Sequence, residues 1–555
     1  MLPKHSSRLI FSRSFTRVGP STQRRTDEPA SKYRSKHYNP TSTSNDSKPT
    51  EKIHLEPHIL SRRLIKLCDD RRLDVAVAML KNSPLDAQNV PVWNTLIWEC
   101  LKAERYRLGH DLYIDMKRRG HRPNTRTFQT LMNGLSRIED WDSHTKQLAH
   151  SHSIYELSGH DPSSAELSVA PIAAYVKILG SAGLHQQIFD VFYSLDTEGR
   201  LAPDRFLFTA MFQALAVKPY TDSDNFVQNA ASAKLLWNLM LKASRRTNFS
   251  IDGFLVSSAI IALSRGRDAD QEFALGLVAE HFGLVAFDAV DEPASPKKEE
   301  KGSIPLEPQS FAAVLTLCRN SAKPIHAINF FAAVLKRPES QGGPSIIDRA
   351  HVEQVLQSFL AAEIPASSQK ALELVEWMLA QEIKSSSSVA AKIRPTHSTF
   401  NLIISQICRA ENDWRVAAKV FDLMTGYHSH DFMDGVEATK PRFDRRSPGR
   451  NIPPTAEVLS SMMRIAVGSE SRANIRQALR LIHYFGFRSL IQPPDTLESK
   501  KAMKDKAFYI SKLAQAVLAG IKDCVQPEHS ERETTCKRSW AMAVTSVRRA
   551  KSFGF

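Results

Sequence analysis

Apolar residues recur along most of the chain at helical spacing, and the clearest example lies between Val90 and Asn124. Its first stripe has positions i, i+3, i+4, i+7 and i+8, occupied by Trp93, Leu96, Ile97, Cys100 and Leu101. After a polar break at 102–105, a second stripe contains Leu108, Leu112, Tyr113 and Met116. Such spacing places each set on one face of an amphipathic helix. The segment therefore predicts two successive helices.

Helix-termination signals close this segment. Three basic residues, at 117–119, fall in the last turn of the second predicted helix, where cations suit the negative end of the helix dipole. Gly120 can adopt the left-handed conformation of a helix cap, and Pro123 prevents the helix from continuing. The 35 residues from Val90 to Asn124 are thus predicted to form one helix–turn–helix hairpin.

The same opening pattern returns along the chain, so the hairpin is one unit of a repeat. Approximate starts are at residues 57, 90, 125, 169, 205, 253, 308, 348, 397 and 456. Polar insertions separate some units, at 218–227, 285–305, 337–346, 384–393 and 425–452. One hairpin cannot bury its apolar face alone, and stacking against its neighbours supplies the missing core. The sequence therefore predicts an all-α fold, an α-solenoid of stacked helix–turn–helix repeats.

The Val90–Asn124 unit resembles a pentatricopeptide repeat over its full length. The resemblance rests on WNTLI, the K-A-x-R turn, the Y-x-x-M second helix and the closing G-x-x-P-N. A tetratricopeptide repeat would have a 34-residue period and a W-x2-L-G-x2-Y signature, and neither is present. The resemblance extends with uneven quality over 57–490. Residues 491–555 contain one apolar helical pattern, from Ala507 to Ile521, and form a C-terminal helical extension of unassigned role.

Membership of this family implies binding of single-stranded RNA, with one base read per unit by two or three side chains. In the family, the fifth and last residues of a unit read the base. In the best unit these positions are Asn94 and Asn124, a pair that implies a pyrimidine. In the unit that opens at residue 205 they are Thr209 and Asp252, which is similar to pairs that prefer guanine.

Other units depart from this pattern. Asn401 matches the fifth position of a later unit, but its closing partner is not evident. Ala173 and Ala312 occupy the same position in two further units and cannot hydrogen-bond to a base. Base-by-base reading along the whole array is therefore not expected.

The charge distribution indicates a targeting segment at the N-terminus. The net charge is +15; the first fifty residues hold ten Lys/Arg and three Asp/Glu, or +7 of it. Residues 1–25 have six basic and no acidic residues among many serines and threonines, which is typical of a mitochondrial transit peptide. Residues 26–56 are polar and predict a disordered linker. We expect the mature protein in the mitochondrial matrix; the alternative is that this segment is a basic disordered tail, such as that of a nuclear protein.

No motif for catalysis, metal binding or a cofactor is recognisable. The chain has neither a GxxxxGK[ST] nor a GxGxxG phosphate loop, and its six cysteines form no CxxC pair. The segment His54–His58 has the order HxExH with an internal proline, which is incompatible with the helical HExxH zinc site. No stretch is long and apolar enough to span a membrane. The sequence therefore predicts no enzyme, no cofactor and no metal.

Two functions fit these features. The first is a mitochondrial RNA-binding protein that acts on the stability, processing or translation of a messenger or ribosomal RNA by stoichiometric binding. The second is a helical-repeat scaffold, for example a component associated with the mitochondrial ribosome, in which most units contact protein. A repeat-fused nuclease or editing enzyme would need a catalytic domain that is not recognisable in the chain.

Overall fold

The computed structural model describes residues 56–158, 168–217, 225–285, 304–364, 366–384, 387–436, 440–447, 449–485 and 500–524. The chain divides into two units, Met1–His54 and Leu55–Phe555. The predicted transit peptide at 1–25 and nearly all of the predicted linker at 26–56 lie outside the described residues. The following description concerns the second unit.

The described part of this unit consists of paired helices. Ten hairpins follow one another: α1 (Pro57–Asp69) with α2 (Leu73–Asn82), α3 (Val90–Lys102) with α4 (Tyr106–Arg118), α5 (Thr125–Leu135) with α6 (Thr145–Ser158), α7 (Ala170–Ser181) with α8 (His185–Tyr193), α9 (Arg205–Ala216) with α10 (Asn225–Thr247), α11 (Gly253–Leu263) with α12 (Asp268–Phe282), α13 (Pro308–Asn320) with α14 (Pro324–Lys336), α15 (Arg349–Ala362) with α16 (Ser367–Lys384), α18 (His397–Ala410) with α19 (Trp414–Thr425), and α20 (Ala456–Gly468) with α21 (Arg472–Phe485). Short helix α17 (Ser387–Ile393) and long helix α23 (Lys500–Cys524) complete the series. The prediction of an all-α solenoid is confirmed.

The repeat starts read from the sequence agree closely with the helices. Eight of the ten coincide with the first residue of a helix, and those at 169 and 348 fall on the residue just before α7 and α15. The agreement is good because the start of a helix is signalled locally, by a short polar cap followed by an apolar stripe.

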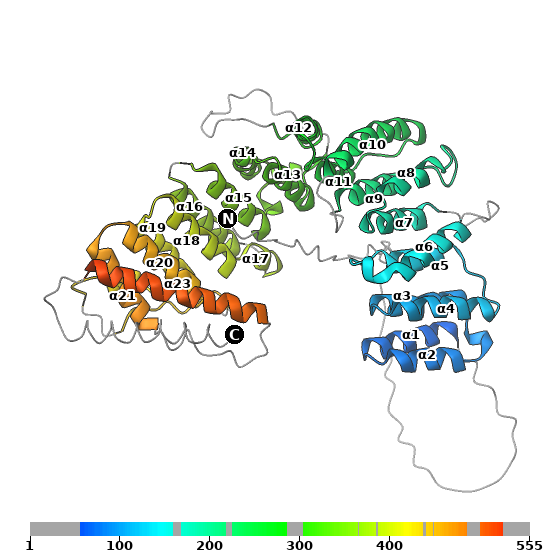
Figure 1. Ribbon diagram of the computed structural model, residues 1–555, viewed down its shortest axis with the longest axis horizontal. Coiled ribbons are helices and arrows are strands. Elements are labelled where there is room, and N and C mark those ends of the chain that lie inside the picture. Colours follow the sequence, from blue (N-terminus) through cyan, green and yellow to red (C-terminus); the bar gives the residue numbers. More distant parts are fainter. Residues whose placement is uncertain are drawn as a thin grey trace, which may run out of the picture. The chain divides into compact units, whose positions relative to one another are not determined.

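The first helices of the hairpins form one continuous layer (Figure 1). Each packs against the next, from α1 through α3, α5, α7, α9, α11, α13, α15 and α18 to α20. Second helices pack on their own partners and, as α14 does on α15, also on the first helix of the next hairpin. The largest wholly buried side chains come from both helices of the hairpins: Trp93, Phe208, Phe212 and Phe311 from first helices, and Phe282, Phe330 and Phe421 from second helices. Stacking of hairpins therefore provides the core that a single hairpin lacks.

Short polar side chains cap several first helices. Asn124, Asp204 and Asp252 each accept a hydrogen bond from a backbone N–H in the first turn of the helix that follows, at 3.0, 2.8 and 2.9 Å. Asn89 and Asp348 do the same for α3 and α15. These bonds satisfy backbone donors that have no partner inside the helix. The residue that ends one unit thus has a structural task in the next.

The predicted insertion at 425–452 is ordered and cross-braced where it is described. Arg442 makes an ion pair with Asp431 at 2.8 Å, and Ser429 donates two hydrogen bonds to the Asp422 carboxylate. Gln477 of α21 accepts from the Trp414 indole and donates to the carbonyl oxygen of Ser429, each at 2.8 Å. The segment is therefore held onto its own hairpin and the next one.

Helix α23 covers the last hairpin. The sequence predicted a helix from Ala507 to Ile521, and the helix runs from Lys500 to Cys524 and packs mainly on α20. Leu513 and Val517 are completely buried in this contact. A terminal helix of this kind shields the apolar face of the last repeat, as solenoids require. The rest of 491–555 lies outside the described residues.

Candidate nucleic-acid interface

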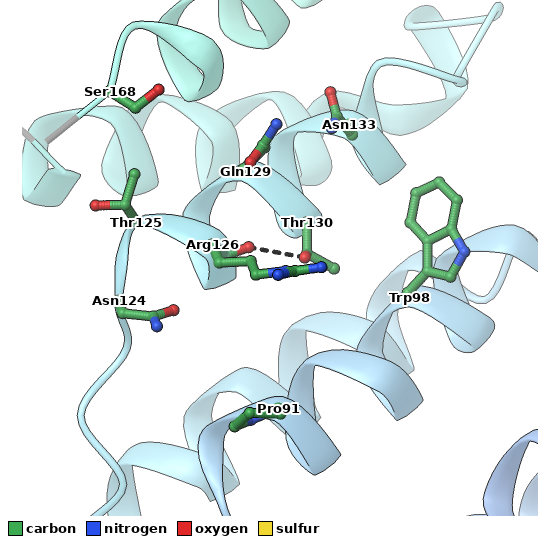
Figure 2. Close-up of a pocket in the computed structure, with 9 residues that line it drawn as sticks. All are labelled: Pro91, Trp98, Asn124, Thr125, Arg126, Gln129, Thr130, Asn133 and Ser168. Atoms are coloured by element: carbon green, nitrogen blue, oxygen red, sulfur yellow. Dashed lines mark hydrogen bonds between the residues drawn. The ribbon is translucent and has the colours of Figure 1, made fainter. Parts of the chain in front are cut away.

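A polar groove opens over the first-helix layer at α5 (Figure 2). It has a volume of about 720 Å³. Its lining comes from α3, from α5 and from the residues that precede α5 and α7: Pro91, Trp98, Asn124, Thr125, Arg126, Gln129, Thr130, Asn133 and Ser168. Most of these side chains are polar, and the indole of Trp98 lies at one end of the groove.

One face of α5 supplies the hydrogen-bonding groups of this groove. Arg126, Gln129, Thr130 and Asn133 follow one another at i, i+3, i+4 and i+7, so they form one stripe. Thr130 donates to the backbone carbonyl of Arg126 at 2.7 Å. The side chains of Arg126, Gln129 and Asn133 make no hydrogen bond or ion pair with any described residue. These donors and acceptors are free to bind a polar ligand.

Gln129 and Ser168 were missed by the sequence analysis. Gln129 is the fifth residue of the unit that starts at residue 125, and Ser168 is the last residue of that unit, before the start at 169. The structure places both in the same groove. The same count from the start of the unit that selected Asn94 would also have selected Gln129. The pair was missed because a long stretch of sequence separates Gln129 from Ser168.

The predicted pair Asn94 and Asn124 is divided between the core and the groove. Asn94 exposes only 7% of its surface, and its side-chain carbonyl oxygen is buried without a hydrogen-bond partner. Asn124 lines the groove while its Oδ1 caps α5. A buried acceptor without a donor costs about 1–3 kcal/mol. Such an acceptor would be stabilised by any ligand that brings a donor to it.

Capping makes Asn124 a residue whose removal destabilises the fold. We expect Asn124→Ala to lower the free energy of unfolding by about 1 kcal/mol, because α5 loses a side-chain acceptor for its first turn. Asn124→Asp keeps an acceptor there and adds a charge that suits the helix start. Thermal unfolding followed by circular dichroism compares the two. Equal losses in both variants would show that the cap contributes nothing.

The second predicted pair is linked through one arginine. Thr209 is 7% exposed and donates to the backbone carbonyl of Arg205 at 2.7 Å, and the Arg205 guanidinium lies 3.5 Å from the Asp252 carboxylate. Asp252 also caps α11. The Arg205–Asp252 contact shows that the start of α9 lies beside the cap of α11, although a long helix and a loop separate them in the sequence.

Two exposed aromatic rings lie at the same edge, where the first helices α9 and α11 begin. Phe206 and Phe254 are the second residues of α9 and α11, and they expose 61% and 48% of their surface. Because α9 packs against α11, the two rings occupy equivalent places on neighbouring helices. Packed helices lie about 8–10 Å apart, which is of the order needed to admit one planar base between two rings. Sequence reasoning did not single out either ring.

The remaining predicted positions are largely enclosed. Asn401 is half-buried, and its side-chain carbonyl oxygen has no partner, like that of Asn94. Ala173 is buried in α7 and Ala312 is half-buried in α13. Neither alanine offers a hydrogen-bonding group, so the hydrogen-bonding capacity of the layer varies from unit to unit.

Basic residues lie along the carboxyl ends of the first helices. Burial and the charge of Arg319 lower the pKa of the Arg265 guanidinium; Arg265 follows α11, and Arg319 lies in the last turn of α13. Arg265 also lies over the ring of Phe226 at 4.7 Å. An anion beside the two guanidinium groups would relieve their repulsion.

Two other kinds of site were sought in the described residues. No group of three or more His, Cys, Asp or Glu side chains there is arranged to hold a metal ion. None of the described helices combines the length and apolar character needed to cross a membrane.

Comparison with known proteins gives one match by sequence and several by structure. Residues 88–137 match the PPR repeat family. No curated protein matches the chain. The crystal structure of the pentatricopeptide repeat protein PPR10 from maize is similar with a TM-score of 0.42 and 14% identity, over 89% of this chain and 60% of that one. Two structures of PPR10 in complex with an 18-nt psaJ RNA element have TM-scores of 0.38 and 12% identity, and this chain covers 61% of theirs. The chain thus spans about three fifths of the length of these proteins.

Proposed function

Because this chain is a pentatricopeptide-repeat protein, we propose that it binds single-stranded RNA along the edge of its first-helix layer. The observation that carries the proposal is the groove on α5, in which three polar side chains without partners face an opening of about 720 Å³. The protein acts by occupying RNA, not by transforming it.

A bound base would be recognised both by stacking on aromatic rings and by hydrogen bonds to its edge. Phe206, whose ring has the Arg205 guanidinium over it at 4.8 Å, and Phe254 both offer apolar ring surface to a base, and base–aromatic stacking is tolerant of sequence. Gln129 and Asn133 offer both donors and acceptors to a base edge. Arg126 in the groove supplies charge for a phosphate, which makes binding dependent on salt.

We place this activity in the mitochondrial matrix, where the protein would affect the stability, processing or translation of a messenger or ribosomal RNA. The support is the acid-free, arginine- and serine-rich composition of residues 1–25. A fusion of residues 1–56 to a fluorescent reporter tests the address. Reporter signal in the nucleus or cytosol would contradict it.

Crosslinking in cells tests the function itself. Ultraviolet crosslinking of the tagged full-length protein, followed by sequencing of bound RNA, should give discrete single-stranded footprints. Gln129→Ala combined with Asn133→Ala should weaken or shift them, because this pair removes hydrogen-bonding groups from the groove without touching the Asn124 cap. Lys146→Ala, a change on a second helix, is the control. The absence of footprints above background would overturn the proposal.

A scaffold function has one observation in its favour. Consecutive second helices α6, α8 and α10 each expose a large apolar side chain, namely Leu157, Tyr193 and Leu235 at 52%, 69% and 66%. Exposed apolar groups at related places suit a protein partner. Co-purification of a defined partner that survives ribonuclease and is lost in Leu235→Asp would support this second candidate.

A further inference from the structure

Three arginines converge where two first helices begin. Arg349 is the first residue of α15, and Arg394 lies two residues before Thr396, the N-cap of α18. Arg450 comes from the ordered segment between α19 and α20. Arg349 donates through Nη1 to the backbone carbonyl of Arg394 at 3.4 Å. The cluster thus joins three parts of the sequence that span about a hundred residues.

A single buried carboxylate holds two of these arginines. Arg394 and Arg450 both donate through Nε to Oε1 of Glu382, at 2.6 and 3.0 Å. The Glu382 side chain is 2% exposed, whereas those of the two arginines are 35% and 32% exposed. The buried carboxylate therefore lies beneath, and the guanidinium groups lie between it and solvent.

The outer edges of the guanidinium groups are unused. Nη1 and Nη2 of Arg394 and Arg450 make no hydrogen bond or ion pair with a described residue. The nearby carboxylates of Asp348 and Glu353 are already engaged, with His351 and with Thr399. Of these carboxylates only Glu382 contacts the cluster directly, and it contacts two of the three arginines.

Such an arrangement matches a phosphate group. The planar fork of each guanidinium binds two oxygens of a phosphate in parallel, and the bonds are charge-assisted. Nε is already tied to Glu382, so the orientation of each fork is fixed before any ligand arrives. Fixing donors in advance reduces the entropy lost on binding.

We propose that Arg349, Arg394 and Arg450 form a phosphate-binding site for the RNA strand. This inference rests on the proposed function. Asp348 caps α15 as Asn124 caps α5 in the groove of Figure 2, and Thr396 occupies the N-cap position of α18. The site therefore lies on the edge of the layer along which the RNA would run, and one phosphate between two bases would reach it.

Salt dependence of RNA binding by the full-length protein tests the site. The slope of log Kd against log salt should fall by about 0.7 in the Arg349→Gln/Arg450→Gln double variant, the value for one phosphate contact on a single strand. Affinity near 0.1 M salt should fall about fivefold or more, with base preference unchanged. Arg394 remains in this variant to neutralise Glu382, and circular dichroism verifies the fold. Arg445→Gln is the matched control, because Arg445 is exposed in the same segment as Arg450 and makes no contact with the cluster.

A second arm distinguishes the RNA strand from a free phosphate compound. Wild-type protein and the double variant are titrated calorimetrically with pyrophosphate in the absence of RNA. An RNA slope equal to that of Arg445→Gln, with no binding of pyrophosphate, would overturn the site while leaving RNA binding intact. Pyrophosphate binding that is lost in the variant, with an unchanged RNA slope, would keep the site and overturn its assignment to RNA. If wild-type protein binds no RNA, the proposed function fails, and the pyrophosphate arm alone decides the site.

Discussion

Replacing Phe206 and Phe254 together by alanine is expected to weaken RNA binding by about two orders of magnitude. Each ring that stacks on a base contributes about 1–3 kcal/mol, or about 5- to 150-fold in Kd, and both rings would flank the same base. Both side chains are largely exposed, so the fold should lose little. Fluorescence anisotropy with a single-stranded RNA recovered by crosslinking measures the change.

Two variants separate stacking from general apolar contact. Phe206→Tyr keeps a flat ring and should bind nearly as well as the wild type, whereas Phe206→Leu keeps the volume and loses the ring. Tyr193→Ala removes a ring that is 69% exposed on second helix α8, and it should leave binding unchanged. If Tyr193→Ala weakened binding as much as the double alanine variant, RNA would not follow the first-helix edge.

The second large effect concerns the closest approach of two first helices. A Cβ atom added at Gly180 of α7 would lie 2.4 Å from Cβ and 2.6 Å from Cα of Ala214 in α9. Backbone cannot move aside as a side-chain tip does, so Gly180→Ala must separate the two helices. We expect a loss of about 1–3 kcal/mol, larger than the helix-propensity gain of about 1 kcal/mol.

A matched substitution isolates the clash from the change in propensity. Gly276 lies inside α12 and has no atom within 4 Å of an added Cβ. Gly276→Ala should therefore stabilise the protein by about 0.5–1 kcal/mol. Hydrogen exchange of amides in α7 and α9 is the preferred measurement, because solenoids need not unfold in one step. Similar protection in both variants would disprove a close contact between α7 and α9.

The first-helix layer explains why both predictions depend on neighbouring units. Gly180 matters because α7 touches α9, and Phe206 acquires its proposed role because Phe254 has the equivalent place on α11. No single hairpin contains either feature. Substitutions that open the layer should therefore weaken RNA binding even when they lie away from the edge.

The sequence by itself determined the hairpins and where they begin. Local signals were sufficient: the apolar stripe that starts at Trp93 and the stop signals at Gly120 and Pro123 each depend on residues a few positions apart. Helix formation and termination depend on such short-range contacts, and the repeat multiplied the signal. The resemblance in one unit then indicated the family.

Only the tertiary structure decided which side chains are accessible to a ligand. Asn94 and Gln129 share the fifth position of their units, yet the first is buried in the layer and the second faces the groove. Burial depends on how far neighbouring helices approach, which no single unit specifies. The convergence of Arg394 and Arg450 on Glu382 joins residues separated by 12 and 68 positions. Contacts of this range follow from the stacking of hairpins and the folding of the inserted segment, and these have no local pattern in the chain.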